Sequence, residues 1–274
     1  MIPTLAGLLM SVAFAAPGDL SAELDALASA PEPVLQAQAE GPWREALLAQ
    51  AALSERQHPG LTVLAANLTP IRTRKGTPRF VDEALTEPGL APLLLVRLVE
   101  AGDPVDVRVA LVDAARRAEA DPALVAGLIG VEADPAVRRM LVESLSGAPL
   151  AVAEPELVRA SADPSPDVRA GPARAIGAHP NGASLGTPLL ALLVDPAAAV
   201  RIEACRASGW LGISEAWALL SARVADPDPT VRLRAIRALQ RIDPARAALH
   251  PAVLGSVGDP DAKVARAARQ VTGG

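Results

Sequence analysis

The stretch "DPDPTVRLRAIRAL", Asp226 to Leu239, joins two Asp-Pro pairs to an apolar, arginine-rich run. Related wording occurs earlier, as "DPSPDVRAGPARAI" from Asp163 and "DPAAAVRIEACRAS" from Asp195. When the chain is aligned on the Val of this phrase, that Val recurs every 30 to 33 residues. Its positions are Val107, Val137, Val168, Val200, Val231 and Val264. A fixed period of this length is the signature of a repeat protein.

A second marker with the same period indicates that each repeat contains two short helices. A proline stands before an apolar run in most periods, and Ser214 takes that place in one of them. The prolines are Pro92, Pro122, Pro155, Pro188 and Pro251. Proline suits the first helical position because its missing N–H has no partner there. We expect a first helix to begin at each marker and a second helix to begin at the Asp-Pro turn.

The second helices are predicted to be amphipathic. At 100° per residue from Val231, one apolar stripe contains Ala235, Ala238, Leu239 and Ile242, and the opposite side contains Arg237, Gln240 and Arg241. A pair of such helices cannot bury its apolar side alone, so successive pairs must stack into a solenoid. The seventh residue after the Val is small in most repeats, which predicts close helix packing. These residues are Ala114, Ser144, Ala175, Ala207, Ala238 and Val271.

Composition agrees with an all-α protein. Half of the 274 residues are hydrophobic and only 2% are aromatic, so the core consists of Ala, Leu and Val, of which Ala and Leu are strong helix formers. A net charge of −5 argues against a general nucleic-acid binder. Cys205 is the only cysteine, which excludes an intrachain disulfide and a cysteine-based metal site.

The six units from about Leu90 to Val271 resemble HEAT repeats, in the short form also found in phycobilisome-lyase-type proteins. The resemblance implies a right-handed α-α superhelix. It also implies a ladder in which an Asp five residues before the Val and an Arg directly after it form hydrogen bonds between successive repeats. The matching residues are Asp163, Arg169, Asp195, Arg201, Asp226 and Arg232.

The match is weaker at both ends of the repeat region. Asp259 matches, but Ala265 stands where its arginine would be. In the first two units Arg108 and Arg138 are kept, while the aspartates of the Asp-Pro pairs, at 103 and 134, lie too close to the Val. For these two units the acidic side of the ladder stays open.

The chain divides into three segments in this interpretation. Residues 1–15 resemble a secretory signal, with an apolar run and a small-x-small cleavage pattern at Ala13-Phe14-Ala15, although no Lys or Arg precedes the run. The alternative is an apolar first helix. Residues 16–89 are expected to form a helical cap or degenerate repeats, with helices from Asp19, Pro42 and Leu61 and a basic loop at 72–79. Residues 90–274 are the repeats, and no later segment can span a membrane.

Few residues suggest chemistry. His58, His179 and His250 each precede a proline without metal-ligand spacing, which indicates turn residues. Cys205 occupies a slot that is apolar in most repeats and is expected to pack as a small hydrophobe. Trp210 and Trp217 flank a turn and are interpreted as core residues. With no catalytic motif, we expect no enzyme activity, cofactor, metal or small-molecule substrate.

Pro172 conflicts with the pattern because it falls inside a predicted second helix. Such a proline removes a backbone hydrogen bond and usually bends the helix. We interpret this position as a kinked or late-starting helix; the alternative is a local change in solenoid curvature.

One row of charges suggests a binding surface. The sixth residue after the Val points away from the apolar stripe, and the six are Asp113, Glu143, Arg174, Arg206, Arg237 and Gln270. The resemblance to HEAT folds implies that this row lines the concave face. Arg174, Arg206 and Arg237, with Arg241 one turn further, would then hold an acidic segment of a partner protein, since the guanidinium fork suits carboxylates. The alternative is an ordinary solvated face.

The favoured function is therefore a non-catalytic, periplasmic or secreted scaffold that binds another protein along a HEAT-like solenoid. One alternative, implied by the resemblance alone, is a lyase or chromophore-attachment factor. Another is a structural subunit of an envelope complex. Repeat folds host many unrelated roles, so the fold itself does not choose between them.

Overall fold

A computed structural model describes residues 20–61, 64, 68, 70–81, 85–87, 89–99 and 102–273. The chain forms two compact units, Met1–Met140 and Leu141–Gly274, here called unit 1 and unit 2. The predicted signal sequence at 1–15, and most of the helix predicted from Leu61, lie outside the described residues. The predicted segment boundary at 89/90 stays a prediction.

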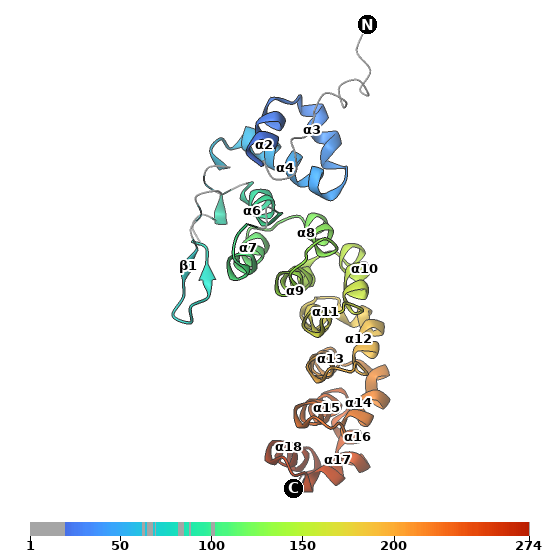
Figure 1. Cartoon of the computed structure of the whole chain (residues 1–274). Coiled ribbons are helices and arrows are strands. Elements are labelled where there is room, and N and C mark those ends of the chain that lie inside the picture. Colours follow the sequence, from blue (N-terminus) through green and yellow to red (C-terminus); the bar gives the residue numbers. More distant parts are fainter. Residues whose placement is uncertain are drawn as a thin grey trace. The chain divides into compact units, whose positions relative to one another are not determined.

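Unit 1 contains helices and one small hairpin (Figure 1). Its elements are α2 (Leu20–Ser29), α3 (Glu32–Ala39), α4 (Trp43–Gln57), β1 (Ile71–Arg72), β2 (Pro78–Arg79), α6 (Leu90–Val99), α7 (Val105–Arg117), α8 (Pro122–Ile129) and α9 (Pro135–Ser144), the last of which continues into unit 2. Helix α4 packs against α2, α3, α6 and α8. Helices begin near Asp19 and Pro42 as predicted, and α3 was not predicted.

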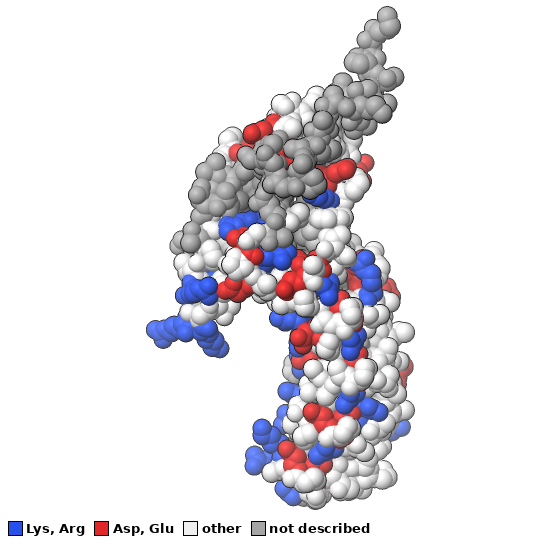
Figure 2. All heavy atoms as spheres, viewed as in Figure 1, with Lys and Arg blue, Asp and Glu red and all other residues white. Residues whose placement is uncertain are grey.

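The basic segment at 72–79 is a hairpin, so the predicted loop is wrong. Its strands are antiparallel, with Ile71 opposite Arg79 and Arg72 opposite Pro78. Gly76, at a φ of 76°, provides the left-handed turn, and its carbonyl accepts a hydrogen bond from the Arg72 side chain. Two-residue strands are too short for an alternating pattern, so the sequence signals only the turn. Lys and Arg side chains project from this hairpin in Figure 2.

Unit 2 is a helical-repeat solenoid with two helices in each period, as the periodicity predicted. Its elements are η2 (Leu145–Gly147), α10 (Leu150–Ala160), α11 (Pro166–Ala178), η3 (Gly182–Leu185), α12 (Gly186–Leu192), α13 (Ala198–Leu211), η4 (Ser214–Ala216), α14 (Trp217–Arg223), α15 (Pro229–Ile242), α16 (Pro244–Ala248), α17 (Pro251–Gly255), η5 (Ser256–Gly258) and α18 (Ala262–Thr272). The second helices α11, α13, α15 and α18 pack each on the next and form one layer (Figure 1). The first helices α10, α12, α14 and α17 form the other.

The second helices begin at Asp-Pro turns, as expected. The Asp228 carboxylate accepts hydrogen bonds from Thr230 N and Val231 N, at 2.7 and 3.1 Å, and so caps α15. Asp261 caps α18 in the same way. Ser165 stands at the N-cap position of α11, but its hydroxyl forms no cap hydrogen bond. Its N–H instead donates to the Asp163 carboxylate, which organises the turn from outside the helix.

Two prolines, Pro155 and Pro172, lie inside helices, and Pro92 and Pro188 are the third residues of α6 and α12 and do not begin them. Pro155 lies inside α10 and does not begin it, because Pro149 already supplies the N-cap position. Pro172 lies inside α11, which runs unbroken from Pro166, so the late-starting helix is wrong. Both rings are accommodated within continuous helices, at the loss of one backbone donor each.

The second helices approach one another closely, as the small residues predicted. A Cβ atom added to Gly209 of α13 would lie 2.6 Å from Ala238 Cα of α15. A Cβ on Gly177 of α11 would lie 3.1 Å from the Cβ of Ala207. Both glycines are ninth after their repeat Val, a slot for which no role was predicted. These contacts between glycine and alanine set the spacing of α11, α13 and α15.

Candidate protein-binding face

Three arginines of unit 2 link successive repeats. Each donates through Nε and Nη2 to both carboxylate oxygens of the Asp in the following repeat. The pairs are Arg169–Asp195 (2.7 and 3.1 Å), Arg201–Asp226 (2.8 and 2.8 Å) and Arg232–Asp259 (2.8 and 2.8 Å). Such bidentate pairs fix geometry as well as charge. Nη1 of each arginine donates to two main-chain carbonyls of its own Asp-Pro turn; for Arg201 these are Asp195 O and Pro196 O, both at 2.9 Å.

The ladder is buried, and the pKa values of its groups reflect this. Burial opposes the charged form of Asp226, but hydrogen bonds from Arg201 and from Asp228 N outweigh it and hold the pKa of the carboxyl below its usual range. The pKa of Asp195 is lowered in the same way by Arg169. The more exposed Asp259 has a lowered pKa chiefly because Arg232 donates to it. These carboxylates are ionised, link successive repeats and are not available to a ligand.

Glu132 completes the ladder in unit 1. It stands five residues before Val137, the slot that Asp occupies in later repeats, and it forms an ion pair with Arg108. Its carbonyl also accepts from Arg138. Glu132 was not predicted, because the Asp-Pro pattern does not include it, although its spacing to Val137 alone identifies the position. Asp103 and Asp134 have other partners: Asp103 pairs with Arg97, and Asp134 accepts from Ala136 N and Val137 N at the start of α9.

The predicted arginine row runs along the other side of the same helices, and its first two arginines, Arg174 and Arg206, form ion pairs within unit 2. Arg174 of α11 lies between two carboxylates, with Nη1 2.8 Å from Glu143 and Nε 3.3 Å from Glu203. Arg206 of α13 donates to the same Glu203, at 2.8 Å. Burial lowers the pKa of Arg174, yet the two carboxylates raise it above its ordinary value. Arg174 therefore holds neighbouring helices together.

The second half of the row is exposed. Arg237 and Arg241 of α15 both face solvent, and the Arg241 guanidinium lies 4.6 Å from the centre of the Trp210 ring. Trp210 is 65% exposed, so its assignment to the core is wrong. It is tenth after Val200, the slot that Arg241 fills in the next repeat, and that slot points outward. Trp217 is buried as predicted, beneath the Arg246 guanidinium at 4.1 Å.

Cys205 and the histidines serve the fold. Cys205 is fully buried, and burial raises the pKa of its thiol to about 12, so the predicted apolar role is confirmed. The histidines stand at helix ends: His58 and His179 follow α4 and α11, and His250 caps α17. The Nδ1 atom of His179 accepts from Asn181 N, so its Nε2–H donates to Ala148 O at 2.8 Å.

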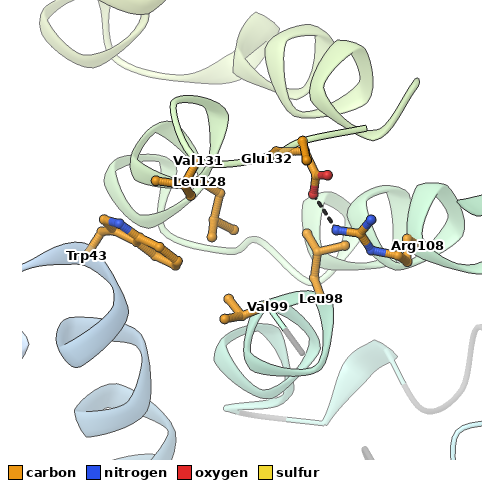
Figure 3. A pocket seen from close by; sticks show the side chains of 8 residues that line it. Trp43, Leu98, Val99, Arg108, Leu128, Val131 and Glu132 are labelled. Carbon is orange, nitrogen blue, oxygen red and sulfur yellow. Dashed lines mark hydrogen bonds and ion pairs between the residues drawn. The ribbon is translucent and has the colours of Figure 1, made fainter. Parts of the chain in front are cut away.

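A small cavity of about 240 Å³ lies in unit 1 (Figure 3). Its walls are largely apolar, from Trp43 of α4, Leu98 and Val99 of α6, and Leu128 and Val131 around α8. The Arg108–Glu132 ion pair closes one side. Ligand sites are usually larger and contain several convergent polar groups. Here both polar side chains are already committed to the ladder, so the cavity is a packing gap between α4 and the first repeats.

The part of the chain that the structure describes contains neither a metal-binding cluster nor a membrane-spanning helix. In those residues, no group of three or more His, Cys, Asp or Glu side chains is placed to hold a metal ion. None of the helices described combines the length and the apolar character needed to cross a membrane.

A match to a family model supports the repeat fold. Residues 186–272, from α12 to α18, match the family model for HEAT repeats, which confirms the predicted resemblance over this segment. No curated protein matches the chain. Similar solved structures include two engineered proteins, each 17% identical. The first covers 67% of this chain and 88% of its own, with a TM-score of 0.44, and the second covers 97% and 76%, with a TM-score of 0.45. A designed armadillo repeat protein in complex with the peptide (KR)4 is 18% identical over 89% of this chain and 99% of its own, with a TM-score of 0.42.

Proposed function

We propose that this protein is a non-catalytic scaffold that binds a partner protein along the second-helix face of unit 2. One observation supports this most strongly. The ladder residues occupy one side of the second helices and satisfy one another, while Trp210, Arg237 and Arg241 stand on another side and remain exposed. Exposed Trp and Arg side chains are the types most enriched at the energetic centres of protein interfaces.

The partner surface that fits this face is acidic and short. Arg206, Arg237 and Arg241 provide three guanidinium groups on two adjacent helices. Further along the row, Glu143 and Glu203 already neutralise Arg174. A long polyanion such as nucleic acid would therefore meet paired carboxylates beyond the first contacts. A protein segment with two or three acidic residues matches the extent of the positive surface.

The place of action in this proposal is outside the cytoplasm. The support is the apolar run and the Ala13-Phe14-Ala15 pattern at the start of the chain. The mature chain would begin near Ala16. N-terminal sequencing of protein from fractionated cells tests this step separately, and protein that keeps Met1 in the cytoplasmic fraction would contradict it.

The binding face is tested with a charge-reversal triple, Arg206→Glu, Arg237→Glu and Arg241→Glu. Arg174 is left unchanged because a carboxylate there would repel Glu143 and Glu203. The matched control reverses three exposed cations elsewhere: Arg116 on α7, Arg159 on α10 and Lys263 at the start of α18. Crosslinked pull-down from the native cell envelope should lose its partner with the face triple and keep it with the control triple. Equal capture by both would contradict the proposal.

A further inference from the structure

Four side chains on α13 and α15 form one compact exposed surface, here called the Trp210 patch: Arg206, Trp210, Arg237 and Arg241. Arg206 and Trp210 are four residues apart on α13, and Arg237 and Arg241 are four apart on α15, so each pair shares one helix face. The two helices pack together, and the two pairs occupy equivalent slots in successive repeats. The patch therefore has four corners, three cationic and one aromatic. Figure 2 shows Lys and Arg side chains at the edge of unit 2 near α15 and α18.

The backbone brings these corners together. Gly209, directly before Trp210, has no side chain, and this lets α13 lie against Ala238 of α15. The same approach places the Arg241 guanidinium over the Trp210 ring at 4.6 Å. A cation held over an aromatic face in this way is attracted by the ring quadrupole. The indole and the guanidinium are thus partly ordered before any partner arrives, which reduces the entropy lost on binding.

The patch is open in both charge and area. Most of the Trp210 surface is exposed, and the Arg206 side chain keeps 41% of its exposure despite its bond to Glu203. Among the described residues, no carboxylate forms an ion pair with Arg237 or Arg241. Glu203 is shared between Arg174 and Arg206, so it leaves the positive charge at Arg237 uncompensated. Because the Trp210 side chain is 65% exposed, it is not part of the hydrophobic core of unit 2.

We infer that the Trp210 patch binds a short acidic segment of the partner protein in which a large apolar side chain is flanked by carboxylates. The apolar side chain packs on the indole of Trp210, and the flanking carboxylates accept from Arg206 and Arg237. Arg suits this role because its planar fork matches a carboxylate with two parallel hydrogen bonds. This inference rests on the proposed function and specifies the chemistry of its partner.

The patch favours a protein segment over a nucleic acid. Single-stranded nucleic acids require a positive groove that follows several phosphates together with stacking residues. Here the aromatic corner stands alone on the row: the slot equivalent to Trp210 is Ala178 in the preceding repeat and Arg241 in the next. Toward α11 the positive surface ends, because Glu143 and Glu203 both pair with Arg174. One apolar anchor and two carboxylates match this surface completely.

The test uses the mature chain and three fluorescein-labelled peptides, Glu-Glu-Leu-Glu-Glu, Glu-Glu-Ser-Glu-Glu and Lys-Lys-Leu-Lys-Lys, with fluorescence anisotropy as the readout. The leucine-containing acidic peptide should bind at least tenfold more tightly than the other two. Trp210→Ala and Arg237→Gln should each weaken it about tenfold. Two controls should change it less than about twofold: Leu249→Ala, which removes another exposed apolar side chain, and Arg159→Gln, which removes one exposed charge on α10.

A double-mutant cycle, which combines Trp210→Ala with the Leu-to-Ser exchange in the peptide, separates the contact to the indole from general charge attraction. In Trp210→Ala, exchanging Leu for Ser in the peptide should have no further effect. The inference is overturned if the acidic leucine peptide does not bind, if the Leu and Ser peptides bind equally to wild type, or if Trp210→Ala binds as wild type does. Tighter binding of a labelled ten-residue oligothymidylate would overturn it in favour of nucleic acid.

The two proposals can fail separately. If the native partner is lost by the Arg206, Arg237 and Arg241 triple but captured normally by Trp210→Ala, the scaffold function stands and the apolar anchor is wrong. Trp210 is exposed, so its loss should leave thermal unfolding unchanged, and circular dichroism confirms that each variant is folded.

Discussion

Arg201 donates two parallel hydrogen bonds of 2.8 Å to Asp226, which lies 25 residues further along the chain, and both side chains are buried. The same guanidinium holds two carbonyls of its own turn. One side chain therefore fixes the end of its own repeat and its distance from the next. Asp226 in turn orients Asp228 by accepting its N–H at 3.0 Å, and Asp228 caps α15. Repeat stacking and helix initiation are thus coupled through one carboxylate.

Asp226→Ala should be strongly destabilising. It leaves the buried Arg201 guanidinium without its partner, and breaking a buried pair in this way costs about 3–5 kcal/mol. The matched control is Asp113→Ala, which removes an exposed carboxylate that pairs with Arg116 and should cost less than about 1 kcal/mol. Urea unfolding followed by circular dichroism measures both. Equal losses of unfolding free energy in the two variants would show that the buried ladder pair stabilises the fold no more than an exposed ion pair does.

Acid should weaken the protein through the same ladder. The pKa values of Asp195, Asp226 and Asp259 are lowered in the folded chain, so the unfolded chain binds protons first as pH falls. Their contribution is complete well above the unfolded pKa of about 3.9 and decreases as pH falls through and below that value. Asp259→Asn should show a smaller loss of unfolding free energy between pH 7 and pH 3 than wild type. Asp113→Asn serves as the control, and parallel curves for wild type and Asp259→Asn would refute the linkage.

Two glycines should respond to alanine with opposite signs. At Gly209 the new Cβ would meet the Ala238 backbone at 2.6 Å, so α13 and α15 must separate, at a cost of about 1–3 kcal/mol or more. Gly255, at the end of α17, has no atom within 4 Å of the added Cβ. There alanine should be neutral or stabilise by up to about 1 kcal/mol, because glycine is a poor helix former. Thermal unfolding of the two variants compares them, and destabilisation by both would mean that contact distance is not the cause.

Cys205 should be unreactive in the folded protein. Its thiol is buried, and its pKa of about 12 leaves almost no thiolate at neutral pH. Labelling by a disulfide reagent at pH 8 should be at least about 100-fold slower than in denaturant. A double variant, Cys205→Ala with Ser214→Cys at an exposed position, provides the fast reference in the folded state. Rapid labelling of native Cys205 would show that α13 opens readily, contrary to its place in the layer.

The period predicted most of the fold of unit 2, because the positions of Val231, Ala235 and Leu239 follow directly from helical geometry. The hairpin at 71–79 could not be predicted, since its strands are too short for a pattern and only Gly76 signals a turn. The ladder role of Glu132 could have been predicted, because its spacing to Val137 identifies the position although the residue is not an aspartate. Its chemistry is that of Asp with one more methylene.

The binding face was harder to predict than the fold. Arg174 and Arg206 belong to the row, but which carboxylates pair with them depends on the distance between helices, and a single sequence does not give that distance. Trp210 was assigned to the core because it flanks a turn. Its slot, shared with Arg241 in the next repeat, shows that it points outward. Equivalent positions in successive repeats are therefore more informative about Trp210 than its place beside a turn.

The separation of ladder and face on each second helix has a consequence for how such a surface can change over generations. Arg201 and Gly209 fix the spacing of α13, while Arg206 and Trp210 contribute little to it. Substitutions at the two outward slots can therefore alter what is recognised without loss of folding. A single inserted residue cannot alter recognition in this way without disturbing the fold. It would turn every later side chain of the helix by about 100° and move the outward pair into the layer. Sequence change in this region should therefore occur as substitutions at the two outward positions of each second helix, without insertions or deletions.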